Sequence, residues 1–145
     1  MLIQRILSTK GGEVLTVTSA TSIADAVAVL TEHRIGALVV SDDGGQSTAG
    51  ILSERDIVRA LGSDGTEILG RAVADLMTTE VFTCGPDATA EELMGLMTEH
   101  RIRHIPVLAD GKLAGIVSIG DVVKHRLGEL ETETQALHDY IATGR

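Results

Sequence analysis

The chain has 145 residues, of which 43% are apolar and only 1% aromatic, and its formal net charge is -9. An acidic surface is not expected to bind nucleic acid or an anionic membrane, because proteins normally meet both with basic faces. The length suits one domain, or two small halves that share a core of aliphatic side chains.

The lone cysteine, Cys84, excludes an internal disulfide and fits a reducing compartment. The apolar run at the N-terminus is too short for a signal peptide, and no stretch approaches the roughly 20 apolar residues of a membrane span. We therefore predict a cytoplasmic protein.

An internal duplication organises the chain. The pentapeptide Thr-Glu-His-Arg-Ile occurs at residues 31–35 and again at residues 98–102. Five identical residues in a row, in frame with matching apolar patterns, indicate two copies of one structural unit.

The same predicted elements recur in chain order in both copies. A short amphipathic turn (residues 3–8 and 73–78) leads to a short strand (16–18 and 81–83). A helix then begins after a capping box, Ser22 with Asp25 and Thr89 with Glu92, and carries an apolar stripe at helical spacing. Two strands follow, at residues 35–40 and 49–52 and at residues 102–108 and 113–117, the second pair joined by the tight-turn dipeptide Asp110-Gly111. Each copy therefore predicts the order β-α-β-β-α.

A strand-to-helix phrase closes each copy: Gly-Ile-Leu-Ser-Glu-Arg-Asp at residues 50–56 and Gly-Ile-Val-Ser-Ile-Gly-Asp at residues 115–121. The exposed N–H groups and dipole of a helix start can hold a phosphate, and the carboxylate one turn later can accept hydrogen bonds from sugar hydroxyls. The alternative is a capping box that only starts a helix. A carboxylate and a hydroxyl at both junctions favour a binding role.

The apolar helical spacing continues beyond Asp121 as far as Ile141, with acidic residues on the other side. Gly128 is interpreted as a kink or as the join between two helices. The extra amphipathic helix must bury its stripe on its own domain or on a second subunit, and the sequence leaves both open. The predicted divisions are a first repeat at 1–62 with its helix ending near Gly62, a surface linker at 63–72, a second repeat at 73–127 and a helical extension at 128–145.

The duplicated β-α-β-β-α order and the two Gly-hydrophobic-x-Ser-x-x-Asp phrases resemble the paired CBS domain, named after cystathionine beta-synthase. Further matches are His104-Ile105-Pro106-Val107 and the lead-in Val73 to Thr78, and the resemblance covers about residues 1–127. It implies an α/β (α+β) fold, a pseudo-twofold pair of units with two clefts between them, followed here by the C-terminal amphipathic helix. It also implies adenosyl ligands such as AMP, ADP, ATP, NAD(H) or S-adenosylmethionine.

The resemblance assigns ligand-binding residues by position. Asp56 and Asp121 would hold ribose hydroxyls, Ser53 and Ser118 would lie at phosphates, and Thr16 and Thr83 would lie at the base. The strand residues that would face the clefts are Gly36, Ala37, Arg103, His104 and Ile105.

The two clefts are predicted to differ in charge. Arg101, Arg103, His104 and Lys112 make the second copy locally basic, and we favour phosphate contacts for Arg103 and His104 over a merely solvated face. The first copy has Gly36 and Ala37 at the matching positions, so its cleft is expected to offer space, with Arg55 as its cation.

Two other features are interpreted as structural. His100 and His104 would suggest a metal pair on one helix, but a strand should begin between them, so no metal site is predicted. Cys84 beside Gly85-Pro86 lacks an implied partner and is interpreted as an idle thiol.

The sequence therefore predicts a non-catalytic adenine-nucleotide sensor that acts on a partner protein in trans. The alternatives are a nucleotide-hydrolysing enzyme that uses Asp121 or His104 as a base, and a structural dimer with empty clefts. A homodimer is expected from the family habit of associating pairs into discs and from the surplus stripe at Leu130, Leu137 and Ile141. The sequence does not identify the regulated partner.

Overall fold

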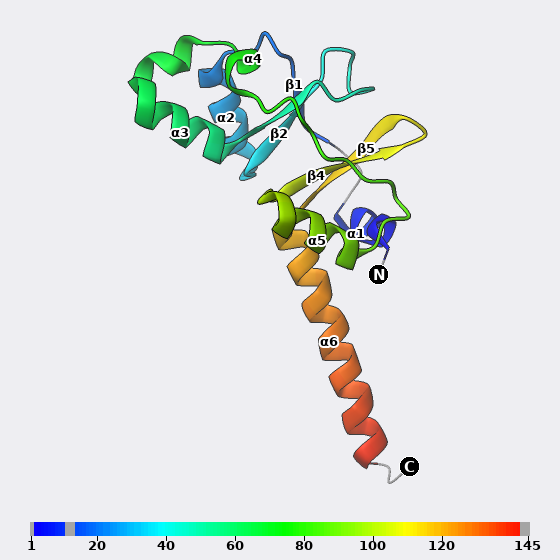
Figure 1. The fold of residues 1–145 in the computed structure, drawn as a ribbon. Coiled ribbons are helices and arrows are strands. Elements are labelled where there is room, and N and C mark those ends of the chain that lie inside the picture. The colour runs from blue at the N-terminus through cyan, green and yellow to red at the C-terminus, as the bar shows by residue number, and fades with distance from the viewer. Residues whose placement is uncertain (1, 11–13, 143–145) are drawn as a thin grey trace.

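The two sequence copies form two halves, each with a separate core (Figure 1). The computed structural model describes residues 2–10 and 14–142. Its first half contains β1 (Thr16–Val17), α2 (Ile23–His33), β2 (Ala37–Val40), β3 (Gly50–Ser53) and α3 (Glu54–Asp64). In this three-stranded sheet β1 pairs parallel to β2, and β2 pairs antiparallel to β3. The predicted order β-α-β-β-α is confirmed for this copy.

The second half contains α5 (Ala90–His100), β4 (His104–Ala109), β5 (Lys112–Ser118) and α6 (Ile119–Ala142). Strands β4 and β5 form an antiparallel hairpin. Asp110 and Gly111 at its tip have φ of 54° and 76°, the left-handed conformation that the tight turn requires.

The expected strand at residues 81–83 does not form. The structure has a single bridge instead, in which the Cys84 N–H donates to the Pro106 carbonyl (3.1 Å) and the Cys84 carbonyl accepts from the Leu108 N–H (2.8 Å). Extending this parallel ladder toward Phe82 would require an N–H on Pro106, which proline lacks. Val39 occupies the matching position in the first copy, where it pairs with Thr16.

Each lead-in segment packs in the half that is formed by the other sequence copy. Helix α1 (Ile3–Lys10) lies in the core of the second half, where Ile3 and Ile6 are fully buried. Helix α4 (Val73–Leu76) lies in the core of the first half, where Val73 is fully buried. Backbone bonds hold both exchanges: Ile3 N–H donates to the Ala88 carbonyl (2.9 Å), and Val73 N–H donates to the Thr21 carbonyl (2.7 Å). The predicted divisions 1–62 and 73–127 thus separate the two sequence repeats, but each core contains residues from both divisions.

The predicted linker is part of the first core. Helix α3 continues past Gly62 to Asp64, and Gly65 (φ 75°) caps it. A 3₁₀ helix, η1 (Gly65–Gly70), follows, and its Ile68 is fully buried. The segment 63–72 is therefore held in place by the burial of Ile68 in the first core.

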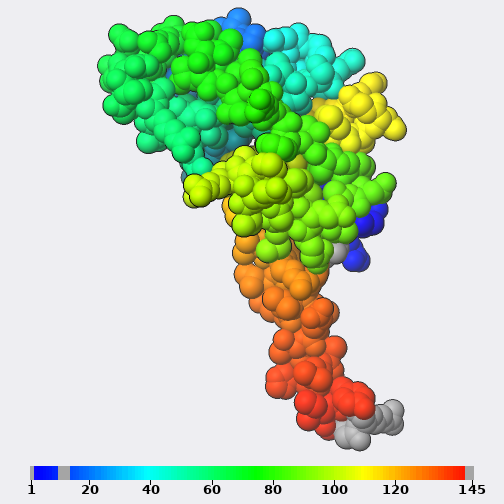
Figure 2. All heavy atoms as spheres, viewed as in Figure 1, coloured from blue at the N-terminus to red at the C-terminus, as the bar shows by residue number. Residues whose placement is uncertain are grey.

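Helix α6 runs without a break through Gly128, so the expected kink or join is absent from it. It begins beside the second core, where Val122 is buried, and its C-terminal part projects away from the two halves (Figures 1 and 2). None of the helices in residues 2–10 and 14–142 combines the length and apolar character needed to cross a membrane.

Candidate functional site

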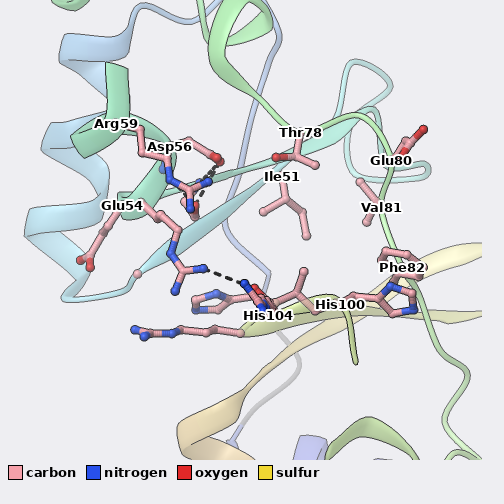
Figure 3. Close-up of a pocket in the computed structure, with 16 residues that line it drawn as sticks. Ile51, Glu54, Asp56, Arg59, Thr78, Glu80, Val81, Phe82, His100 and His104 are labelled. Carbon is pink, nitrogen blue, oxygen red and sulfur yellow. Dashed lines mark hydrogen bonds between the residues drawn. The ribbon is translucent and has the colours of Figure 1, made fainter. Parts of the chain in front are cut away.

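A pocket of ≈ 300 Å³ lies between the two halves, a volume at the lower end of the range for small-molecule sites (Figure 3). Its first wall is the start of α3 with Gly36 and Ile51. Its second wall is the segment 100–104, which leaves α5 and enters β4. Residues of the connection 78–82 close a third side. The pocket therefore forms only when both copies come together.

Asp56 and Ser53 form a capping box at the start of α3. The Ser53 N–H and hydroxyl both donate to Asp56 Oδ2 (3.0 Å each), and the Asp56 N–H donates to the Ser53 hydroxyl (3.3 Å). Within the described part of the chain these bonds use only Oδ2, which leaves Oδ1 to accept from a ligand. The Asp56 side chain can therefore cap the helix with one oxygen and bind a ligand with the other.

Four arginines and three carboxylates line the pocket: Arg55, Arg59, Arg101, Arg103, Glu54, Asp56 and Glu80. Figure 3 shows the Glu54 and Glu80 carboxylates toward opposite outer edges, whereas Asp56 turns toward the middle. The Arg55 guanidinium donates to the Arg101 carbonyl (3.3 Å), which links the helix of the first copy to the second copy. The pocket is therefore a cationic site in an acidic chain, suited to a phosphate.

Aromatic and small residues shape the remaining surface. The rings of Phe82 and His100 stack, with centroids 3.9 Å apart and planes at 21°. A Cβ added at Gly36 would lie 3.5 Å from the His104 ring, so the imidazole occupies the space that this glycine leaves. Among the residues that the structure describes, no group of three or more His, Cys, Asp or Glu is arranged to hold a metal.

The pocket brings together half of the predicted site residues: Gly36, Ser53, Arg55, Asp56, Arg103 and His104. The others lie outside its lining: Thr16, Ala37, Thr83, Ile105, Ser118 and Asp121. Ile105 is fully buried in the second core, because successive strand residues face opposite sides and His104 faces the pocket. Ser118 and Asp121 form the matching cap at the start of α6.

The first-copy cleft was expected to offer space with Arg55 as its cation, and the pocket contains Arg55 together with cationic residues of the second copy. Arg103 and His104 line the same pocket as Gly36 and Asp56, because β4 begins opposite the start of α3. Sequence reasoning also missed several lining residues: Arg59, Thr78, Glu80, Val81 and Phe82. It named Arg101 only as part of the basic stretch of the second copy. Arg59 could have been found, since it follows Asp56 by three positions and thus shares its helix face. The residues of the connection carried no such signal.

Cys84 is predicted to react slowly with thiol reagents. Burial and the nearby Glu92 carboxylate raise the pKa of the Cys84 thiol to about 11. The thiolate is the reactive form, and at pH 8 the native thiol should hold about 200-fold less of it than an unperturbed cysteine, whose pKa is about 8.5, and should react correspondingly more slowly. Reaction with a disulfide reagent, before and after unfolding in urea, measures this ratio. Equal rates would contradict the burial of Cys84.

Comparison with protein families matches residues 5–63 and 73–128 to the CBS domain. The CBS domain-containing protein CBSX3, mitochondrial, of Arabidopsis thaliana is 40% identical over 149 residues, which cover 98% of this chain and 72% of that protein.

Solved structures give the same result. The CBS-domain protein ATU1752 from Agrobacterium tumefaciens has 44% identity and a TM-score of 0.84, covering 87% of this chain and 99% of that chain. The CBS domain pair of protein MJ0100, in complex with 5′-methylthioadenosine and S-adenosyl-L-methionine, has 27% identity and a TM-score of 0.78, covering 89% and 98%. With two matched domains and a shared fold over most of its length, the chain belongs to the CBS-domain family as a CBS pair.

Proposed function

We propose that this CBS pair is a regulatory module that binds an anionic adenine nucleotide in the pocket at Asp56. The observation that carries the proposal is the convergence of Asp56, at the start of α3, with the arginines of the opposite copy. The ribose hydroxyls donate to Asp56 Oδ1, and the phosphates lie among Arg55, Arg59 and Arg103. The adenine packs against Ile51 and Val81.

The charge of the pocket favours ATP or ADP over S-adenosylmethionine. The guanidinium groups can bind phosphate oxygens in pairs, whereas S-adenosylmethionine brings a positive sulfonium and no phosphate. The MJ0100 pair binds two adenosine derivatives, which supports an adenosyl ligand of some kind for this fold. AMP and NAD(H) fit the same sugar and phosphate contacts.

The ligand acts by stabilising one conformation or partner complex over another, without a reaction. A solved structure from Burkholderia ambifaria, 38% identical to this chain, is described as that of a candidate signal-transduction protein with CBS domains, which supports a regulatory role. The module acts in trans, on a separate partner protein. We keep the cytoplasm as the proposed location, although the Arabidopsis relative is named mitochondrial.

Thermal unfolding with AMP, ADP, ATP, NAD(H) and S-adenosylmethionine tests the proposal. A ligand at 100 times its dissociation constant should stabilise the fold by about 2.7 kcal/mol. If no compound shifts the unfolding temperature, the alternative of a structural dimer with empty clefts would be favoured. A nucleotide hydrolysis product in the same tube would identify an enzyme.

Asp56→Asn should weaken nucleotide binding about tenfold or more, because it removes a charged hydrogen-bond acceptor worth about 1.5–3 kcal/mol. The amide oxygen can still accept from Ser53, so the unfolding temperature without ligand should change little. Calorimetric titration measures the affinity.

Asp121→Asn is the matched control. Asp121 forms the same cap on α6 but lies outside the pocket. The nucleotide affinity of the Asp121→Asn variant should equal that of the original chain. Loss of binding in Asp121→Asn but not in Asp56→Asn would place the ligand in the other cleft.

A further inference from the structure

The C-terminal part of α6 extends into solvent in the part of the chain that the structure describes. Every residue from 131 to 142 is exposed, and Figure 2 shows this part projecting beyond the body of the molecule. Isolated helices shorter than about 12–15 residues are marginal in water, and helices in proteins gain most of their stability from packing an apolar face. This segment also contains β-branched and small polar residues, which are weak helix formers. Its helical conformation therefore calls for a surface that packs against it.

The exposed apolar residues of α6 follow a heptad pattern. Steps of four and three residues alternate through Val123, Leu127, Leu130, Thr134, Leu137 and Ile141. The five apolar members are 43–66% exposed. The stripe follows the a and d positions, with one polar member at Thr134, and two further exposed side chains, Ile119 and Tyr140, lie at neighbouring g positions. This is the narrow seam of a coiled coil rather than the broader face that packs on a globular core.

The charges beside this seam identify the occupant and its direction. In a parallel pair, a g residue faces the e residue five positions later on the other helix. Arg126 then faces Glu131 of the second copy, and Glu133 faces His138 of the second copy. An antiparallel pair that keeps the apolar layers matched would place Glu131 opposite Glu131 and Glu133 opposite Glu133. Among pairings that keep the whole apolar seam in contact, the charges of α6 therefore favour the parallel direction.

Arg126 already donates to Glu129 on its own helix (2.9 Å), and the same nitrogen lies 3.8 Å from Glu91 Oε1 of α5. Both contacts use one nitrogen, and a guanidinium has five N–H donors, so its other donors can hold a carboxylate on another helix. Glu129 occupies position c, next to the seam, and leaves the a and d positions open.

We propose that α6 forms a parallel two-stranded coiled coil with α6 of a second copy over residues 123–141. The two bodies then lie at the same end of the stalk. The inference does not depend on the proposed nucleotide, and its tests measure mass and cross-linking, which nucleotide binding does not report.

Sedimentation equilibrium of the full chain tests the pairing. The double variant Leu130→Glu, Leu137→Glu places charges at two d positions and should halve the mass of the complex. The matched control, Thr132→Glu with Gln135→Glu, adds the same charge on the outer face and should keep the mass. The proposal would be overturned if the original chain were monomeric, or if the Leu130→Glu, Leu137→Glu variant kept the mass of the original complex.

Cross-linking tests the direction, in a Cys84→Ser background that removes the native thiol. Leu137→Cys should form a disulfide-linked dimer under mild oxidation, because d positions face each other in a parallel pair. The antiparallel pair would instead link Leu137→Cys chains only to Leu127→Cys chains in a mixture. That result would refute the parallel arrangement.

Discussion

Ile6→Ala should lower the free energy of unfolding by about 2–5 kcal/mol, the usual effect of deleting a large buried aliphatic side chain and leaving a cavity. Ile6 lies near the N-terminus, yet it is fully buried in the core of the second half, together with Ile105 and Val117. The damage should therefore appear far away in the sequence. Urea unfolding measures the loss, and hydrogen exchange should show faster exchange in β4 and β5.

Leu2→Ala is the control for this change. Leu2 precedes the same helix but is 40% exposed, so its loss should change the free energy of unfolding by less than about 0.5 kcal/mol. If Ile6→Ala instead increased hydrogen exchange mainly in β2 and β3, the packing of α1 in the second half would be contradicted.

The local elements could be predicted because their signals are local. Ser22, Ser53 and Thr89 each accept a backbone N–H at the start of a helix, as their spacing from an acidic residue predicts. The turn at Asp110-Gly111 is fixed in the same way by two residues that tolerate positive φ. Such features depend on a few neighbours and need no knowledge of the fold.

The exchange of α1 and α4 could not be predicted, because an apolar stripe states that a helix is buried but not against which core. Pro106 is a different case: its missing N–H was visible in the sequence, but its effect on residues 81–83 required the register between Cys84 and Val107. The continuity of α6 through Gly128 has a similar origin. A single glycine costs a helix about 1 kcal/mol, which its neighbours can offset.

The site was predictable only in part, for the same reason. The repeated phrase identified Ser53 and Asp56 from adjacent residues. The strand residues Arg103 and His104 were also named, but their placement opposite Asp56 depends on how the halves pack. Sequence symmetry assigned these cations to the copy that contains them, whereas the pocket takes them from the opposite copy.

Arg103→Glu should weaken the binding of ATP by at least about 100-fold. Losing a charge-assisted hydrogen bond costs about 1.5–3 kcal/mol, and a carboxylate near a phosphate adds repulsion of about 1–4 kcal/mol at 4 Å. A loss of about 2.7 kcal/mol already corresponds to 100-fold in the dissociation constant. The fold should persist, because the contact of residue 103 with α6 is a backbone bond, from the Ile119 N–H to the Arg103 carbonyl (2.8 Å). Calorimetric titration measures the effect.

The control Lys112→Glu makes the same change in net charge on the exposed tip of the β4–β5 hairpin, outside the pocket. Long-range charge effects are screened over about 8–10 Å at physiological salt, so this variant should keep its affinity. AMP, with one phosphate, should lose less affinity than ATP in Arg103→Glu, and S-adenosylmethionine should lose none. Equal losses for ATP and S-adenosylmethionine would show that Arg103 supports the shape of the pocket, and the assignment of phosphates to this wall would then fail.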